Sequence, residues 1–137
     1  MNILITGGAG FLGQQLIRRL LDRGTIGIDG KQREFERIVC FDQAEGTTID
    51  PRVRNVAGNI SDPATVSSLV GADTGVVVHL AAVVSGTAEA DFDLGMRVNL
   101  DGTRHLLDAC RAGGNQPRVL FSSSIAVFGG DLPPTVS

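Results

Sequence analysis

Three glycines that follow the first apolar segment constrain this chain more than any other feature. The N-terminal sequence MNILITGGAGFLG places Gly7, Gly10 and Gly13 between a short apolar run and an amphipathic stretch. This spacing predicts a strand, a tight turn and a helix start, in which the glycines permit the turn, a close approach of main chain to a phosphate, and close packing of the helix. Because the start of a helix attracts anions, the segment predicts a site for a dinucleotide pyrophosphate.

Glycines also occur in ordinary turns, so the neighbouring sequence decides between the two interpretations. Asn2–Thr6 is typical of a buried strand, and Phe11–Arg23 is typical of a helix with one apolar face. The next expected strand, Arg37–Asp42, ends on a carboxylate, which accepts hydrogen bonds from ribose hydroxyls and repels a 2′-phosphate. No basic residue stands between Asp42 and Arg52 to neutralise such a phosphate, so the sequence favours NAD over NADP as cofactor.

Strand and helix signals alternate along the chain, which predicts an α/β fold. The architecture that we expect is a Rossmann-type doubly wound parallel sheet in three layers, α/β/α, truncated after about the fifth strand. Asp62 before Pro63 predicts a capped helix start, and Gly113 with Gly114 predicts a helix end. Besides the segments given above, we expect strands at 53–57, 75–80 and 118–122 and helices at 63–70 and 91–112.

The segment 24–36 is longer than the connections that such folds usually contain, and we interpret it as a surface excursion. The chain has 15 acidic and 12 basic residues without a basic cluster, which argues against nucleic acid and anionic membrane as partners. Its apolar stretches are shorter than a membrane span, and no secretory signal precedes them, so we expect a cytoplasmic protein. Cys40 and Cys110 are expected in the core, and His79 and His105 at packing or surface positions.

Small and polar residues follow several expected strands, at the sheet edge where open α/β sheets bind ligands. Asn59 and Ile60 come after the third strand, where contact with adenine and a local turn both stay open for Asn59. The segment His79–Ala82 ends the fourth strand with small residues, which leave space for a ligand where the sheet opens. Asn99 interrupts an apolar helix face, and a run of serines that includes Ser124 closes the fifth strand, where one hydroxyl is expected to contact substrate.

The motifs TGGAGFLG, GNISD, HLAA, VNLDGT and SSSIAVFG, together with Asp42, resemble the extended short-chain dehydrogenase/reductase family, which includes NAD-dependent sugar-nucleotide epimerases and dehydratases. Within this family, HLAAVVSGTAEADFDLGMRVNLDGT and AVFGGDLP are similar to the D-erythronate dehydrogenase group, which oxidises the C2 hydroxyl of a four-carbon sugar acid with NAD. A sugar-nucleotide epimerase or dehydratase, and a non-catalytic NAD-binding module, stay open as alternatives.

The resemblance implies a role for individual residues. Ser124 would hold the reacting hydroxyl or carbonyl, and Ser85 would contact the small-molecule substrate, a sugar acid or a sugar nucleotide. The cofactor contacts that it implies are Gly7, Gly10, Phe11, Leu12, Gly13, Asp42, Gln43, Asn59, Ile60, Leu80, Ala81, Ala82, Asn99 and Ser122.

The chain departs from the family at the general base, which is a tyrosine supported by a lysine four residues later. The sequence has no tyrosine, and its single lysine is Lys31. We therefore expect residues 1–137 to be the NAD-binding N-terminal portion of an enzyme whose tyrosine and lysine segment and substrate domain lie outside this chain. The resemblance implies a homodimer for the full-length enzyme, and the portion by itself is expected to be inactive.

Overall fold

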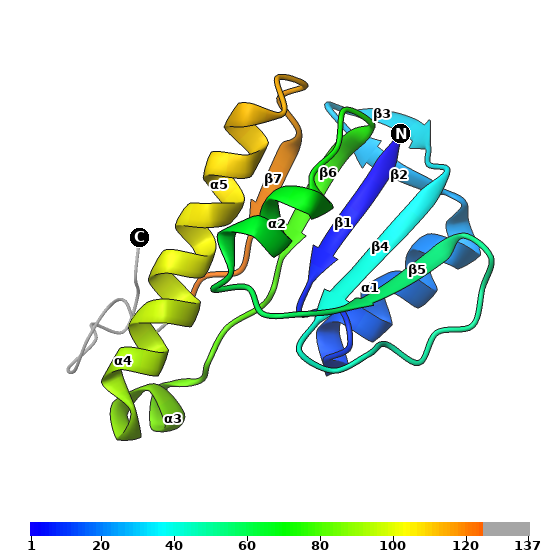
Figure 1. Ribbon diagram of the computed structural model, residues 1–137. Helices are drawn as coiled ribbons and strands as arrows, with labels where there is room; N and C mark the ends of the chain where they lie inside the picture. Colours follow the sequence, from blue (N-terminus) through cyan, green and yellow to red (C-terminus); the bar gives the residue numbers. More distant parts are fainter. Residues whose placement is uncertain (125–137) are drawn as a thin grey trace, which may run out of the picture.

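A sheet of five parallel strands forms the centre of the molecule, in the order β5-β4-β1-β6-β7. The computed structural model describes residues 1–124. Because β1 pairs with β4 on one side and with β6 on the other, the chain moves outward from the centre in both directions (Figure 1), and the predicted doubly wound parallel sheet is confirmed. The strands are β1 Asn2–Thr6, β4 Arg37–Asp42, β5 Val53–Ala57, β6 Thr74–His79 and β7 Arg118–Phe121.

Helices cover both faces of the sheet. Helix α1 (Phe11–Arg23) lies behind the sheet in Figure 1, whereas α2 (Pro63–Leu69) and α5 (Gly102–Ala112) lie in front of it. Successive side chains of a strand point to opposite faces, so Ile3 and Ile5 of β1 pack on the α1 side while Leu4 packs on the α2 and α5 side. The result is the expected three-layer arrangement, with one apolar core on each side of the sheet.

Two predicted helix boundaries are formed by the expected capping residues. The Asp62 carboxylate accepts hydrogen bonds from the main-chain N–H groups of Ala64 and Thr65, each at 3.2 Å, and so caps α2. Helix α5 ends at Ala112 and is capped by Gly113, whose N–H donates to the Ala109 carbonyl at 3.0 Å. Both caps confirm the sequence-based predictions.

The segment 24–36 has a regular structure that the sequence analysis did not predict. It forms an antiparallel hairpin of β2 (Thr25–Ile28) and β3 (Lys31–Glu34). The two turn residues, Asp29 and Gly30, have φ angles of 51° and 74°, the left-handed values that a tight two-residue hairpin turn requires. Because Ile26 and Ile28 pack against the core on the α1 side, the hairpin is attached to the body of the domain.

The helix expected at 91–112 is interrupted in its hydrogen-bonding pattern. Helix α4 (Phe92–Gly95) continues into a π-helical segment, η1 (Met96–Asp101), and then into α5. A short helix, α3 (Ser85–Ala90), precedes it and was not predicted. None of the helices in the described part of the chain is long and apolar enough to cross a membrane.

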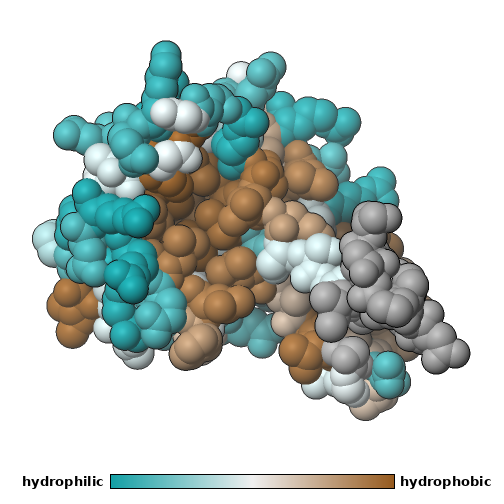
Figure 2. Space-filling view, turned by 180° about the vertical axis from the view of Figure 1, so that it is seen from behind, coloured by the Kyte–Doolittle hydropathy of each residue, from teal (hydrophilic) through white to brown (hydrophobic). Residues whose placement is uncertain are grey.

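An apolar surface extends over the sheet on the face seen from behind (Figure 2). Val119 of β7 packs against the core on the α2 and α5 side, so its neighbour Leu120 points to the α1 side, where it is 60% exposed. Helix α1 therefore covers only part of this face.

Candidate functional site

The glycine turn between β1 and α1 has no room for side chains at two of its three predicted positions. A Cβ atom at Gly7, whose φ is 70°, would lie 2.7 Å from the main-chain nitrogen of Ala81. A Cβ atom at Gly13 would lie 2.5 Å from the Gly7 carbonyl oxygen and 2.6 Å from Gly8 Cα. The sequence thus brings the helix start, the turn and the segment after β6 into direct main-chain contact, as the glycine spacing predicts.

Helix α1 presents its first N–H groups at this turn. Gly10 precedes the helix with extended backbone angles (φ −71°, ψ 171°), and its N–H donates to the Gly7 carbonyl at 3.2 Å. The side chains of Phe11 and Leu12 are 79% and 63% exposed and do not line the cleft between the strand ends. An α-helix leaves its first N–H groups without intrahelical partners, which makes this end suited to a phosphate.

The Asp42 carboxylate is fixed at the carboxyl end of β4, next to the turn. One carboxylate oxygen accepts a hydrogen bond from the Ala9 N–H at 3.1 Å, and the other accepts one from the Gln43 N–H at 2.7 Å. A carboxylate oxygen accepts more than one hydrogen bond, so both atoms retain capacity for ribose hydroxyls.

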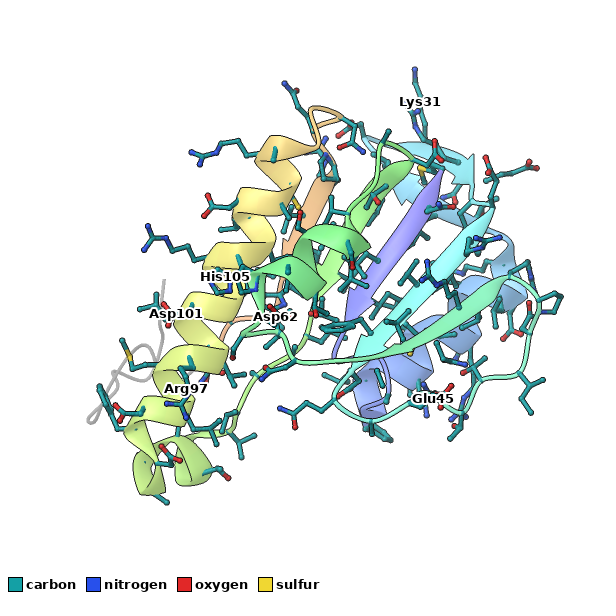
Figure 3. All side chains as sticks on the ribbon, viewed as in Figure 1. Lys31, Glu45, Asp62, Arg97, Asp101 and His105 are labelled. Atoms are coloured by element: carbon teal, nitrogen blue, oxygen red, sulfur yellow. The ribbon has the colours of Figure 1, made fainter. Side chains whose placement is uncertain are left out.

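The first basic residue after Asp42 is engaged elsewhere. The Arg52 guanidinium donates to Asp50 at 3.0 and 3.1 Å and to the Leu21 carbonyl at 3.3 Å, and its hydrogen bonds hold the pKa of Asp50 below the ordinary value. Glu45, by contrast, lies at the same end of the sheet as the glycine turn (Figure 3). This arrangement offers no cation from Arg52 for a 2′-phosphate, in agreement with the preference for NAD.

Gln14 is a residue of this region that the sequence analysis missed. Its amide donates to the Gly8 carbonyl at 2.8 Å, while its carbonyl oxygen accepts from the Thr48 hydroxyl at 2.9 Å. Gln14 therefore connects the glycine turn to the loop between β4 and β5. Its position directly after the third glycine of the motif was the signal available in the sequence.

A cleft of about 270 Å³ opens where the carboxyl ends of the central strands meet. It brings together eight predicted residues from the turn, β4, the segment after β5 and the segment after β6. Asn59 is not among the lining residues: its side-chain oxygen accepts from the Ser61 N–H at 2.9 Å, which is a local turn. The lining residues are Gly7, Gly10, Phe41, Asp42, Gln43, Gly58, Ile60, Leu80, Ala81, Ala82, Val83 and Val98.

A second cavity of about 520 Å³ shares the wall 81–83 with this cleft and is also lined by Asn99, Ser122 and Ser124. The Asn99 amide accepts from the Val83 N–H at 2.8 Å and donates to the Val83 carbonyl at 3.0 Å, so it fixes this shared wall. The side chain of Ser85 lies outside the described residues.

Lys31 is far from the cleft. It lies on the hairpin, at the opposite end of the sheet from Glu45 and the glycine turn (Figure 3). The only lysine of the chain is therefore excluded from proton transfer at the cleft. In addition, the described residues contain no cluster of side chains suited to hold a metal ion, and Cys40 and Cys110 are buried free thiols as expected.

Comparison with known proteins gives matches over almost the whole chain. The model of the NAD dependent epimerase/dehydratase family matches residues 3–137. The chain is 60% identical to D-erythronate dehydrogenase from Cupriavidus necator and 40% identical to the enzyme of that name from Haemophilus influenzae, in each case over 99% of this chain and 42% of the relative. It thus spans about two fifths of the length of these relatives.

Among solved structures, the crystal structure of a nucleoside-diphosphate-sugar epimerase from Agrobacterium tumefaciens is similar, with a TM-score of 0.84 and 44% identity. The match covers 97% of this chain and 40% of the epimerase.

Proposed function

The chain belongs to the NAD dependent epimerase/dehydratase family, and from this premise we propose that it is the coenzyme-binding portion of an NAD-dependent sugar-acid dehydrogenase. D-Erythronate is the substrate that we infer for the full-length protein. The 60% identity to a D-erythronate dehydrogenase carries this inference, because it extends over both the cleft and the second cavity. The assignment of residues 1–137 as a single Rossmann domain of a longer enzyme is part of the proposal.

The residues of the cleft fit NAD. Gly7 and Gly13 have no room for a Cβ atom, so only main chain is present at these two positions of the turn. The pyrophosphate would be held there by the N-terminus of α1. The Asp42 carboxylate would accept hydrogen bonds from the ribose hydroxyls, and Ile60 would lie next to the adenine. When bound, NAD supplies the acceptor for a hydride from the substrate carbon.

The second cavity supports a role in substrate orientation. Ser124 lines it and would donate a hydrogen bond to the oxygen of the reacting C2 hydroxyl, which would fix the carbon next to the wall 81–83. The proton of that hydroxyl requires a base. Because the sequence has no tyrosine and Lys31 lies at the other end of the sheet, the proposal requires that a segment outside this chain provides the base.

The experiment is a substrate comparison with the full-length protein. NAD would be offered with D-erythronate, related sugar acids and UDP-sugars in parallel, and NADH formation would be followed by absorbance. We expect NADH formation with D-erythronate, loss of about a hundredfold or more in kcat for Ser124→Ala, and no change for Ser68→Ala on the surface of α2. NADH formation with none of the acids would contradict the dehydrogenase.

A sugar-nucleotide epimerase is the second candidate, because the similar Agrobacterium structure carries that name. Interconversion of UDP-sugars without net NADH formation would favour it. Tight NAD binding without turnover of any of these compounds would instead favour a non-catalytic module.

We also propose a homodimer through the helical segment 92–112. Apolar side chains are exposed along it, with exposed fractions of 69% for Phe92, 54% for Leu100 and 50% for Leu107. Sedimentation of the full-length protein tests this proposal, since a charge at the interface, as in Leu107→Glu, is expected to shift a dimer to a monomer.

A further inference from the structure

A chain of hydrogen bonds through the buried side chains of Thr6 and His79 leads to the wall that the cleft and the second cavity share. The His79 ring, at the end of β6, is 2% exposed, and its Nδ1 lies 2.6 Å from the hydroxyl of Thr6, which is 0% exposed. On the other side of the ring, Nε2 lies 2.9 Å from the hydroxyl of Thr103 in α5. The ring therefore connects the last residue of β1 to the helix that packs in front of the sheet.

The partners of the two hydroxyls determine the direction of each hydrogen bond. The Thr103 hydroxyl donates its proton to the Asn99 carbonyl at 2.7 Å, so it accepts from His79 Nε2–H. The Thr6 hydroxyl accepts from the Ala81 N–H at 3.3 Å and is free to donate to His79 Nδ1. A neutral ring with its proton on Nε2 satisfies every member of the chain.

One end of this chain of hydrogen bonds is the main-chain N–H of Ala81, which lies against the glycine turn. The Ala81 N–H is held by Thr6, and the Ala81 nitrogen would lie 2.7 Å from a Cβ atom at Gly7, so the main chain at Ala81 packs directly against the turn. At the other end, Thr103 holds the Asn99 carbonyl, and the Asn99 side chain holds both polar main-chain groups of Val83. The two ends of the chain thus fix the two ends of the shared wall 81–83.

We propose that His79, as the Nε2–H tautomer, is a positioning residue for coenzyme binding that holds the wall 81–83 against the glycine turn through Thr6 and Thr103. The inference rests on the proposed function, because it assigns this wall to the NAD site. Reversal of the tautomer would put a proton on Nδ1 and a lone pair on Nε2. The Thr103 hydroxyl would then have to turn its proton from the Asn99 carbonyl to Nε2, while the Thr6 hydroxyl would accept from both Nδ1–H and the Ala81 N–H. The Asn99 carbonyl would lose its hydrogen bond from Thr103, and the Thr6 proton would have no acceptor among these groups, so the wall would lose one of its two attachments.

Thr103 offers an isosteric test of the chain. In the full-length protein, Thr103→Val keeps the shape of the side chain but leaves His79 Nε2–H without an acceptor, whereas Thr103→Ser retains the hydroxyl. We expect Thr103→Val to raise the KM for NAD about tenfold with kcat at saturating NAD nearly unchanged, and Thr103→Ser to restore the original KM. Thr25→Val, in the separate hairpin, is the matched control and is expected to leave both constants unchanged.

Nitrogen NMR of the imidazole gives an independent readout. The expected result for the unmodified protein is a protonated Nε2 and an unprotonated, hydrogen-bonded Nδ1, with this pattern lost in Thr103→Val. A protonated Nδ1 in the unmodified protein, or an unchanged KM for NAD in Thr103→Val, would overturn the inference. Absence of NAD binding by the unmodified protein would overturn the proposed function instead, and the tautomer would still be measured.

Discussion

Substitution of Gly13 by alanine sets two known effects against each other. Gly13 lies inside α1, where alanine is favoured over glycine by about 1 kcal/mol, so helix propensity alone predicts a more stable protein. The structure predicts the opposite, because the added Cβ would lie 2.5 to 2.7 Å from the Gly7 oxygen, Gly8 Cα and the Gly8 oxygen. All three are main-chain atoms, so no side-chain rotation relieves the contact.

Overpacking of this kind costs roughly 1–3 kcal/mol, and a contact with main chain alone favours the upper part of that range. After the gain in helix propensity is subtracted, we expect Gly13→Ala to lower the free energy of unfolding by about 1–2 kcal/mol. Displacement of the turn should also weaken NAD binding about tenfold or more, because hydrogen bonds to the charged pyrophosphate would be lost.

Urea unfolding and calorimetric titration with NAD, both on the full-length protein, measure these two effects. Gly71→Ala is the control, since no atom lies within 4 Å of its added Cβ. Gly10→Ala separates the effects, because its Cβ would meet only the Gly7 oxygen, at 3.2 Å, so we expect weaker NAD binding with a smaller loss of stability. A Gly13→Ala protein that is as stable as the original and binds NAD equally well would refute the reasoning.

Three further predictions concern single side chains. Asp42→Asn removes the charge that repels a 2′-phosphate, so the ratio of the NADP to the NAD dissociation constant should fall about tenfold, and an unchanged ratio by titration would contradict the role of Asp42. Burial lowers the pKa of His79 from its ordinary 6.5, so His79 of the unfolded chain takes up a proton at a higher pH than His79 of the folded protein. The free energy of unfolding should therefore decrease as the pH falls below about 7, by at most about 1.4 kcal/mol per pH unit. The decrease should stop once the pH is below the pKa of His79 in the folded protein. His79→Gln should flatten this decrease in urea unfolding measured at several pH values, and an unaltered slope would exclude His79 as its source. Burial, reinforced by the Asp42 charge, raises the pKa of Cys40 to about 11, so alkylation at neutral pH should occur only after denaturation, and rapid labelling of the native protein by mass spectrometry would count against it.

The central sheet and the glycine turn were accessible from the sequence because their signals are local. The predicted bounds of β1, α1, β4 and β5 agree with the structure, since each element is bounded by a glycine, a proline or a change in hydrophobic period. The hairpin at 25–34 was missed although Asp29 and Gly30 form a strong turn signal, because β3 is a polar strand without an apolar alternation.

The sequence predicts which residues lie at the ends of the strands that form the site, but it does not predict which of these residues contact one another. Asp42 and the glycines follow from spacing, whereas the role of His79 depends on hydroxyls supplied by β1 and α5, far away in the sequence. Asn59 shows the same limit, because an exposed amide pairs with a neighbouring N–H or with a ligand equally well until the fold places it.

The π-helical segment Met96–Asp101 determines how the helix before it is rotated relative to the helix after it. A wider turn holds one residue more than an α-helical turn, so it rotates everything before it by about 100° relative to everything after it. Asn99 lies within this segment and its side chain pairs with Val83, whereas Leu106 lies in α5 and enters the core. Deletion of one residue within this segment is therefore expected to turn α4 around the helix axis by about 100° relative to α5.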